Sequence, residues 1–357
     1  MSKRPPVTPR GRGAVSNPDN RYLSHRYDIV DDGWGSLDAE PESLRTTLSV
    51  DISRTVISYN QSPDVGFDRS INPYRGCEHG CVYCFARPTH AYWGLSPGLD
   101  FESRLFYKPN AATLLRRELA VPAYRCAPIA VGINTDGYQP VERKLKITRA
   151  VLEVLRDCGH PTVIVTKSAL IERDLDILTA MAQRRLIHVM VSLTTLSPEL
   201  ARRMEPRAPA PARRLQTIAC LSQAAVPVGV LVAPVVPVLT DGELETLLAA
   251  ARQAGASSSG YVLLRLPHEL KQLFREWLQQ YWPTQAEHVM NRLRDSRGGK
   301  DYDATFGLRM RGSGAYAELL AQRFRLASKR LNFGTLPPLA KEHFRPPLVS
   351  DGQMELF

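Results

Sequence analysis

The sequence predicts an α/β fold: a partial (β/α)6 TIM-like barrel with a helical C-terminal extension and a flexible N-terminal arm. β-branched apolar runs recur along the middle of the chain, and the stretches between them carry apolar residues at three- and four-residue steps. The predicted strands are residues 128–133, 162–166, 187–193, 226–232 and 261–266. With the segment that enters Cys77 they make about six βα units, which right-handed crossovers arrange as a doubly wound sheet or as a whole or partial barrel.

Local patterns predict the elements before and between these strands. Residues 1–45 contain prolines, glycines and few regularly spaced apolar positions, which is typical of a flexible basic arm. Residues 47–58 alternate and are β-branched, so we expect a strand pair that leads into the cysteine segment. Asp241 can cap one of the helices that follow the strands. These helices are expected at residues 141–156, 171–184, 213–224 and 241–254.

Strand-like runs stop at Pro267, and helical spacing takes over for the rest of the chain. Helices are expected there at residues 269–280, 285–294 and 315–331. The predicted organisation is an arm at 1–45, the barrel at 46–266, a helical extension at 267–335 and a tail at 336–357.

The composition excludes several classes of protein. Of the 357 residues 43% are hydrophobic and 23% are charged, as in globular proteins and unlike disordered ones. No apolar run is long enough to span a bilayer, and the N-terminus lacks the apolar core of a secretory signal, so we expect a cytoplasmic protein without a membrane partner. In that reducing compartment, clustered cysteines are expected to be metal ligands or reactive groups rather than disulfides.

The formal charge of +10 is compatible with an anionic partner, for which nucleic acid is the obvious candidate. The alternative is that the excess lies on the arm and on solvated helix faces, as at Arg184–Arg185 and Arg213–Arg214, and binds nothing. The sequence leaves both readings open.

The chemistry of the chain is concentrated in Cys77, Cys81 and Cys84, which are spaced Cys-x3-Cys-x2-Cys on one short segment. Three thiolates at this spacing can reach three corners of an iron–sulfur cubane and leave the fourth iron open to a small molecule. Gly76 and Gly80 let the backbone wrap closely around the sulfurs. The alternative is a zinc site, whose further ligand is expected among nearby histidines such as His79 or His90, although zinc sites more often pair two Cys-x2-Cys units.

This spacing, with the aromatic Tyr83 before the third cysteine, resembles the radical S-adenosylmethionine (SAM) superfamily. The resemblance implies a [4Fe–4S] cluster whose open iron is chelated by SAM. It also implies that one electron from the reduced cluster cleaves SAM to methionine and a 5′-deoxyadenosyl radical, which abstracts hydrogen from a substrate. The electron is expected from a low-potential donor of the flavodoxin or ferredoxin type.

From about Val56 to Leu266 the sequence further resembles spore photoproduct lyase and its relatives, because residues 132–142 match their Thr-Asp-x-Tyr-Gln-Pro-x-Glu pattern. Short polar groups at a strand end can bind an ammonium or ribose hydroxyls, and these are Asn134, Thr135 and Asp136. Thr135 and Asp136 can alternatively cap the helix expected near residue 141. The two side chains that follow, Tyr138 and Gln139, are expected to line the substrate cavity.

Further candidates for SAM binding follow later strands. By similarity, Lys167 contacts the SAM carboxylate and Ser192 makes a second contact. Glu205 or Arg207 touches SAM or forms an ordinary loop salt bridge.

Two departures from the lyases bear on the reaction. Their hydrogen-returning cysteine is Ile133 here, and the tyrosine after their third cluster cysteine is Phe85. Repair of thymine dimers by that Cys/Tyr relay is therefore not expected. In the C-terminal part, Arg309 and Arg311 lie among glycines and are hypothesised to bind an anionic substrate, the alternative being solvated arginines.

The sequence thus predicts a radical SAM enzyme. Two rival hypotheses are a zinc- or cluster-bearing nucleic-acid module without SAM chemistry and a radical SAM enzyme that modifies a peptide or protein.

Overall fold

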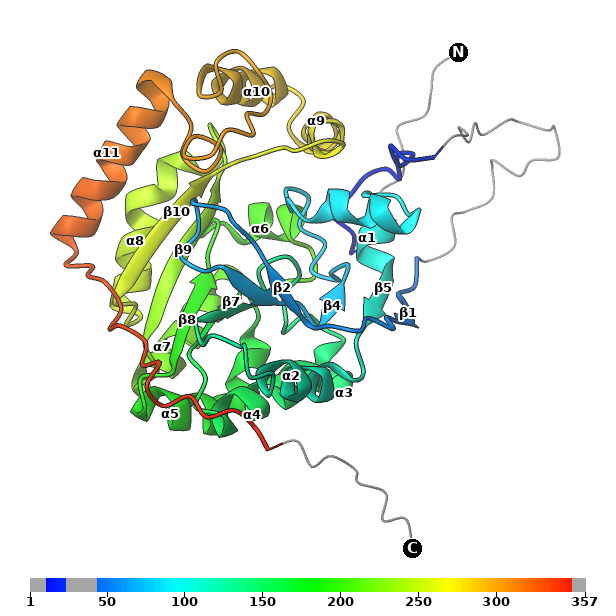
Figure 1. The fold of residues 1–357 in the computed structure, drawn as a ribbon. Helices are drawn as coiled ribbons and strands as arrows, with labels where there is room; N and C mark the ends of the chain where they lie inside the picture. The colour runs from blue at the N-terminus through cyan, green and yellow to red at the C-terminus, as the bar shows by residue number, and fades with distance from the viewer. Residues whose placement is uncertain (1–10, 24–43, 349–357) are drawn as a thin grey trace, which may run out of the picture.

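The computed structural model describes residues 11–23 and 44–348. The chain forms a seven-stranded sheet in the order β10-β9-β8-β7-β6-β3-β2, with helices over its outer face (Figure 1). Its strands are β2 (Ile57–Tyr59), β3 (Arg69–Ile71), β6 (Ile129–Val131), β7 (Thr162–Thr166), β8 (Ile187–Ser192), β9 (Val228–Val235) and β10 (Ser258–Leu263). The run from β3 to β10 is parallel and β2 is antiparallel to β3, so the predicted α/β class is confirmed, with β10 and β2 as open edges.

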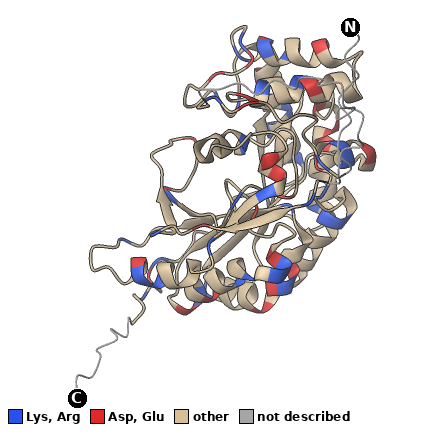
Figure 2. Ribbon diagram, turned by 90° about the vertical axis from the view of Figure 1, so that its right-hand side faces the viewer, with Lys and Arg blue, Asp and Glu red and all other residues tan. Residues whose placement is uncertain are grey.

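The outer helices cover the sheet because their apolar faces meet its β-branched side chains in one continuous core. These elements are α2 (Ala111–Leu119), α4 (Ile147–Asp157), η2 (Ala169–Asp174), α5 (Leu175–Gln183), α7 (Pro211–Gln223) and α8 (Leu244–Gln253). Two further elements are not part of this core: α6 (Pro198–Met204) packs in the apolar cluster of Val82 and Trp277, and η3 (Asp241–Glu243) precedes α8. Figure 2 shows Lys and Arg interleaved with Asp and Glu on these helices, as expected of a solvated layer.

The prediction that residues 47–58 form a strand pair is wrong, because the two strands found there do not pair with each other. Both strands exist, but β1 (Thr47–Val50) pairs with β5 (Arg104–Tyr107) in a separate small sheet, whose third strand is β4 (Tyr74–Arg75). Asp51, which follows β1, anchors the chain to the small sheet and so keeps β1 apart from β2. Its carboxylate accepts hydrogen bonds from Ser53 and Arg75 and lies 2.9 Å from Lys108 Nζ. The short elements beside this sheet are η1 (Arg87–Trp93) and α1 (Asp100–Ser103).

Two helix predictions need correction. The helix expected at 141–156 is broken into α3 (Glu142–Leu145) and α4 at Lys146, whose φ is 53°. The Glu142 carboxylate accepts the Thr148 N–H at 3.0 Å and so supplies the cap that starts α4. Asp241 caps no helix, because one of its oxygens accepts the Tyr316 hydroxyl at 2.8 Å.

The C-terminal part is helical, as predicted, and it is packed into the protein. α9 (Leu270–Tyr281) and α10 (Ala286–Asp295) share an apolar cluster with Cys81, Val82 and Tyr83, and Trp277 of α9 is fully buried there. α11 (Gly314–Arg330) lies beside α8, where Arg323 donates to Glu245 (Figure 1). The domain boundaries from the sequence stay a prediction.

The expectation of little fixed structure in the arm differs from what is found at residues 11–23. Arg12 and Ala14 are buried, and the backbone N–H groups of Gly13 and Ala14 donate to Glu102 at 2.9 and 2.8 Å. The Glu102 carboxylate is buried beside Arg87 and needs these donors, so it draws the segment onto the molecule. We call residues 11–23 the strap; residues 1–10 and 24–43 of the predicted arm lie outside the described residues.

The tail prediction is similarly modified over residues 336–348, where Ala340 is buried and the Phe344 ring packs on Tyr124. Within the described part of the chain, no helix is both long enough and apolar enough to cross a membrane.

Candidate active site

The segment that carries Cys77, Cys81 and Cys84, which we call the cysteine loop, follows β4. It lies between the strand ends, the strap and α9. Cys77 and Cys81 are buried, Cys84 is half-buried, and all three are free thiols. Gly76 and Gly80 have φ of 75° and 66°, and a side chain on Gly80 would meet a Glu102 oxygen at 2.6 Å. Glycine is therefore required on both sides of the first turn, as the sequence indicated.

Two buried side chains hold the backbone of this loop. Gln139 accepts the Glu78 N–H at 2.9 Å and donates to the Gly76 carbonyl at 3.2 Å. Arg87 donates to the carbonyls of Cys81 at 2.8 Å and Gly80 at 3.1 Å. Gln139 and Arg87 thus hold the loop through its backbone and do not occupy the thiols.

The donor set fits a cluster better than a single ion. Among the described residues, no group of three His, Cys, Asp or Glu side chains gathers closely enough to hold one metal ion. A zinc ion needs its sulfurs about 2.3 Å from one centre, whereas each thiolate of a cubane binds a separate iron. His90, one of the alternative zinc ligands, donates its Nε2–H to the Arg104 carbonyl, 2.9 Å away.

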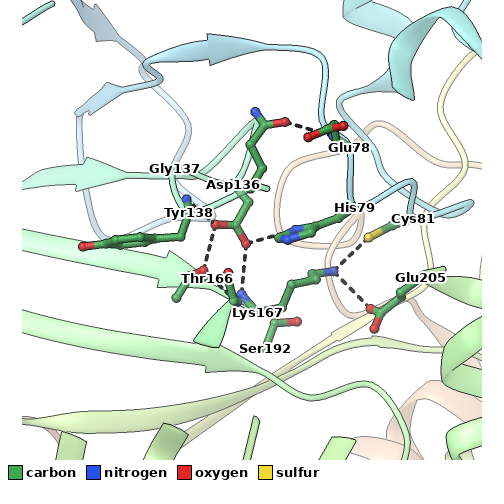
Figure 3. Close-up of polar contacts among 12 residues, drawn as sticks. Glu78, His79, Cys81, Asp136, Gly137, Tyr138, Thr166, Lys167, Ser192 and Glu205 are labelled. Carbon is green, nitrogen blue, oxygen red and sulfur yellow. Dashed lines mark hydrogen bonds and ion pairs between the residues drawn. The ribbon is translucent and has the colours of Figure 1, made fainter. Parts of the chain in front are cut away.

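Asp136 is the centre of the polar contacts at the strand ends (Figure 3). Its carboxylate accepts the Tyr138 N–H at 2.8 Å, the Thr166 hydroxyl at 2.7 Å and the Lys167 N–H at 3.0 Å. His79 of the cysteine loop lies 3.4 Å from Asp136 through Nδ1. Asp136 thus joins two strand ends to the cysteine loop and does not cap α3.

Lys167 joins the cysteine loop to a second buried carboxylate, that of Glu205 (Figure 3). Its Nζ lies 3.1 Å from Cys81 Sγ, 3.0 Å from the Tyr83 hydroxyl and 3.1 Å from Glu205. Glu205 also accepts hydrogen bonds from Tyr83 and from Arg214 of α7. The Lys167 ammonium is therefore tied both to the cysteine loop and to Glu205.

The other predicted SAM-binding residues lie at the same end of the sheet with fewer contacts. Thr135 is buried and donates to the Tyr74 carbonyl at 2.7 Å. Asn134 is exposed and donates its backbone N–H to Asn72. Ser192 ends β8 and donates to the Ala233 carbonyl at 3.3 Å.

Burial and charge set the protonation of this region. Burial raises the pKa of Cys81 to about 11, against the opposing charge of Lys167. Burial alone would lower the pKa of Lys167, but Cys81 and Glu205 outweigh it and the pKa is raised. For Asp136 the effect of burial has the opposite sign, because burial would raise the pKa of a carboxyl group. His79 and the hydrogen-bond donors outweigh burial and hold the pKa of Asp136 below its usual value. Lys167 and Asp136 are therefore charged at neutral pH.

The four predicted substrate residues are divided between this group and other parts of the protein. The Tyr138 side chain is fully buried in the main apolar core, and Gln139 uses both polar atoms on the cysteine loop. Arg309 is bound to Asp64 and donates to Ser62 at 2.5 Å, and Arg311 is exposed. A substrate-binding role for these four residues stays a prediction.

Three charged positions have contacts that the sequence does not reveal. The sequence left open a solvated helix face at Arg213–Arg214, but Arg214 is buried against Glu205 and only Arg213 faces solvent. Glu102 and Arg265 were not singled out. Arg265 alone had a signal, since it is a charged residue between the apolar Leu264 and Leu266 at the end of a predicted strand.

Comparisons with known proteins agree with this geometry. The family model of the Radical SAM superfamily matches residues 71–251. An uncharacterized protein of Mycobacterium tuberculosis is 40% identical over 219 residues, which make up 61% of this chain and 64% of that relative, so the match spans less than two thirds of the relative's length. An uncharacterized protein of Methanocaldococcus jannaschii is 24% identical over 227 residues, 62% of this chain and 79% of that relative.

Solved structures share the fold. A tyrosine-to-phenylalanine mutant of spore photoproduct lyase has a TM-score of 0.58 at 17% identity, covering 82% of this chain and 83% of that one. Spore photoproduct lyase complexed with dinucleoside spore photoproduct has a TM-score of 0.57 at 15% identity, covering 80% and 79%. Because the family model spans just over half of the chain, this protein belongs to the radical SAM superfamily.

Proposed function

We propose that this enzyme reductively cleaves SAM at a [4Fe–4S] cluster held by Cys77, Cys81 and Cys84. The observation that carries the proposal is three free thiols on a loop whose backbone, and not its sulfurs, is tied down by Gln139 and Arg87. When bound, the cluster supplies the electron that splits SAM into methionine and a 5′-deoxyadenosyl radical. Free thiols also suit a reducing cytoplasm, where we expect the enzyme to act.

We assign the binding of SAM to the polar groups at the strand ends. Lys167 is held by Glu205 and Tyr83, and we assign it to the SAM carboxylate as a fixed point charge. Asn134, Thr135, Asp136 and Ser192 are assigned to the remaining polar groups of SAM. A buried ammonium and a buried carboxylate, each kept charged by its neighbours, favour a zwitterionic ligand.

The protein's own contribution is exclusion of water and fixation of charge. The strap and α9 pack over the cysteine loop, where Val82 and Trp277 are fully buried. A site without free water protects a reactive radical from side reactions. Because the substrate itself gives up the hydrogen atom, no side chain is assigned as a general base.

The substrate is proposed to be a nucleic acid or nucleotide. The basic net charge supports an anionic partner, and a related fold is seen in spore photoproduct lyase complexed with a dinucleoside. Repair by the lyases' relay is not proposed, because Ile133 and Phe85 carry no transferable hydrogen of the required kind. A flavodoxin- or ferredoxin-type protein is the proposed electron donor.

Anaerobic reconstitution tests the function. Wild-type protein with iron, sulfide, dithionite and SAM should become brown and release 5′-deoxyadenosine. Replacing Cys77, Cys81 or Cys84 with Ala should remove both the cluster absorbance and the product. Cys220→Ala is the matched control, because Cys220 is a half-buried free thiol on α7 and should be dispensable. A colourless zinc protein, or product formation by the cluster-loop variants, would overturn the proposal.

A further inference from the structure

Arg265 follows the last parallel strand, β10, and its guanidinium carbon lies 4.1 Å from the centre of the Phe85 ring. Phe85 comes directly after Cys84, and both residues are half-buried. Arg265 is therefore stacked on the residue next to the third thiol. Stacking covers one face of the guanidinium and leaves its N–H edges available to a planar or tetrahedral oxyanion.

Arg265 lacks the partner that comparable arginines have. Among the described residues its side chain makes no hydrogen bond and no ion pair. By contrast, Arg87 is paired with Glu102, and Arg297 donates to the carbonyls of Leu308 and Leu264 at 2.7 and 2.9 Å. A cation–π contact stabilises a guanidinium less than the removal of its charge from water costs.

Burial lowers the pKa of Arg265, as expected for a guanidinium that has left water without gaining a carboxylate. Asp64, one of the groups whose charge acts on Arg265, is already bound to Arg309 and accepts the Gly307 N–H at 2.6 Å.

We propose that Arg265 is the docking point for a phosphodiester or phosphate group of the substrate, which it holds beside the cysteine loop. Phosphate is favoured by a second feature. Phe306 is 55% exposed, and its ring lies 4.6 Å from the guanidinium carbon of Arg309, whose charge acts on Arg265. Exposed aromatic rings near cationic side chains are the combination that binds the bases and backbone of single strands. The inference rests on the proposed function for its reaction, but not for its binding step.

Anisotropy of a fluorescein-labelled oligothymidylate measures the binding step without SAM chemistry. Arg265→Gln in the reconstituted enzyme should weaken binding about tenfold and lower the salt dependence by about one phosphate contact. The affinity of Arg265→Lys should lie between those of wild type and Arg265→Gln, since lysine keeps the charge but lacks the planar guanidinium group. Arg325→Gln is the control, because Arg325 is an exposed α11 residue without a partner among the described residues, and it should bind within about twofold of wild type.

Equal affinities for wild type, Arg265→Gln and Arg325→Gln would overturn the inference. So would displacement of the strand by polyglutamate as readily as by thymidine monophosphate or unlabelled strand, because it would show a general anion site. Phenylglyoxal labelling of wild-type protein gives a readout that needs no variant: the oligothymidylate should slow modification of Arg265, and unchanged labelling would count against it. If the enzyme binds the oligothymidylate as expected but does not cleave SAM, only the proposed function is overturned.

Discussion

Single residues in this protein take their roles from what surrounds them rather than from their type. Arg213 and Arg214 are neighbours on α7 and both pair with a glutamate, yet the Arg213 side chain is 41% exposed and the Arg214 side chain 1% exposed. Arg214 holds Glu205, which in turn contacts Lys167 and the Tyr83 hydroxyl of the cysteine loop. A buried pair of this kind costs desolvation, so its value lies in fixing geometry.

Arg214→Met is expected to destabilise the protein by about 3 kcal/mol, because it leaves the Glu205 carboxylate buried with one cation fewer. Arg213→Met removes a partly exposed pair and is expected to cost under about 1 kcal/mol. Urea unfolding of the two variants, compared with wild type, measures both values. Equal losses would show that the Arg214 pair is not structurally special.

Among the elements, the strap lies close to the cysteine loop because a glycine lets the two backbones meet. A Cβ on Gly13 would overlap the Gly80 carbonyl oxygen between the first two thiols. The strap therefore approaches the cysteine loop backbone to backbone, and the two N–H groups it gives to Glu102 depend on that approach. Its close fit makes it a cover for the site rather than an independent arm.

Gly13→Ala should release the strap, because overpacking at a backbone contact costs roughly 1–3 kcal/mol. Limited tryptic digestion should then cut faster after Arg12 and Arg21, which lie in the strap. Gly66→Ala is the matched control, since nothing lies within 4 Å of a Cβ built there and the variant should be digested like wild type. Unchanged cleavage of Gly13→Ala would mean that the contact does not hold the strap.

At the scale of the whole molecule, the open sheet is bridged between its two edges. Asp64 lies beyond β2 at one edge, and Arg309 belongs to the segment that returns past β10 at the other. Their ion pair, with the Gly307 N–H bonded to Asp64, joins chain segments from opposite ends of the strand order. This ion pair limits how far the two edges of the sheet can move apart. Among the described residues the two edge strands, β10 and β2, do not pair with each other.

Asp64→Ala should loosen this bridge. Hydrogen exchange of residues 302–312 should become at least about tenfold faster, because a hydrogen bond to a charged group is worth about 1.5–3 kcal/mol. Asp68→Ala provides the comparison, as Asp68 pairs only with its neighbour Arg69 and its side chain is 54% exposed. Equal exchange in the two variants, measured by mass spectrometry, would argue that the edges are held by other contacts.

The sequence by itself determined the parallel strands, their helices and the cysteine loop. Each is encoded within a few neighbouring residues: the period of the apolar pattern, the Cys-x3-Cys-x2-Cys spacing and the polar residues at strand ends, of which Asp136 and Lys167 do face the loop. Parallel strands must bring their carboxyl ends to one edge, so even the convergence of these side chains was predictable.

Only the tertiary structure decided the rest, because it depends on contacts between distant segments. Whether Arg214 is buried or solvated, whether Tyr138 faces a cavity or the core, and whether residues 11–23 are free or bound to Glu102 depend on partners that no local pattern names. The same holds for Arg265, because its stacking on Phe85 of the cysteine loop joins two segments that are distant in the sequence. Burial turns such positions from ordinary charges into fixed ones, since an unpaired charge away from water is costly.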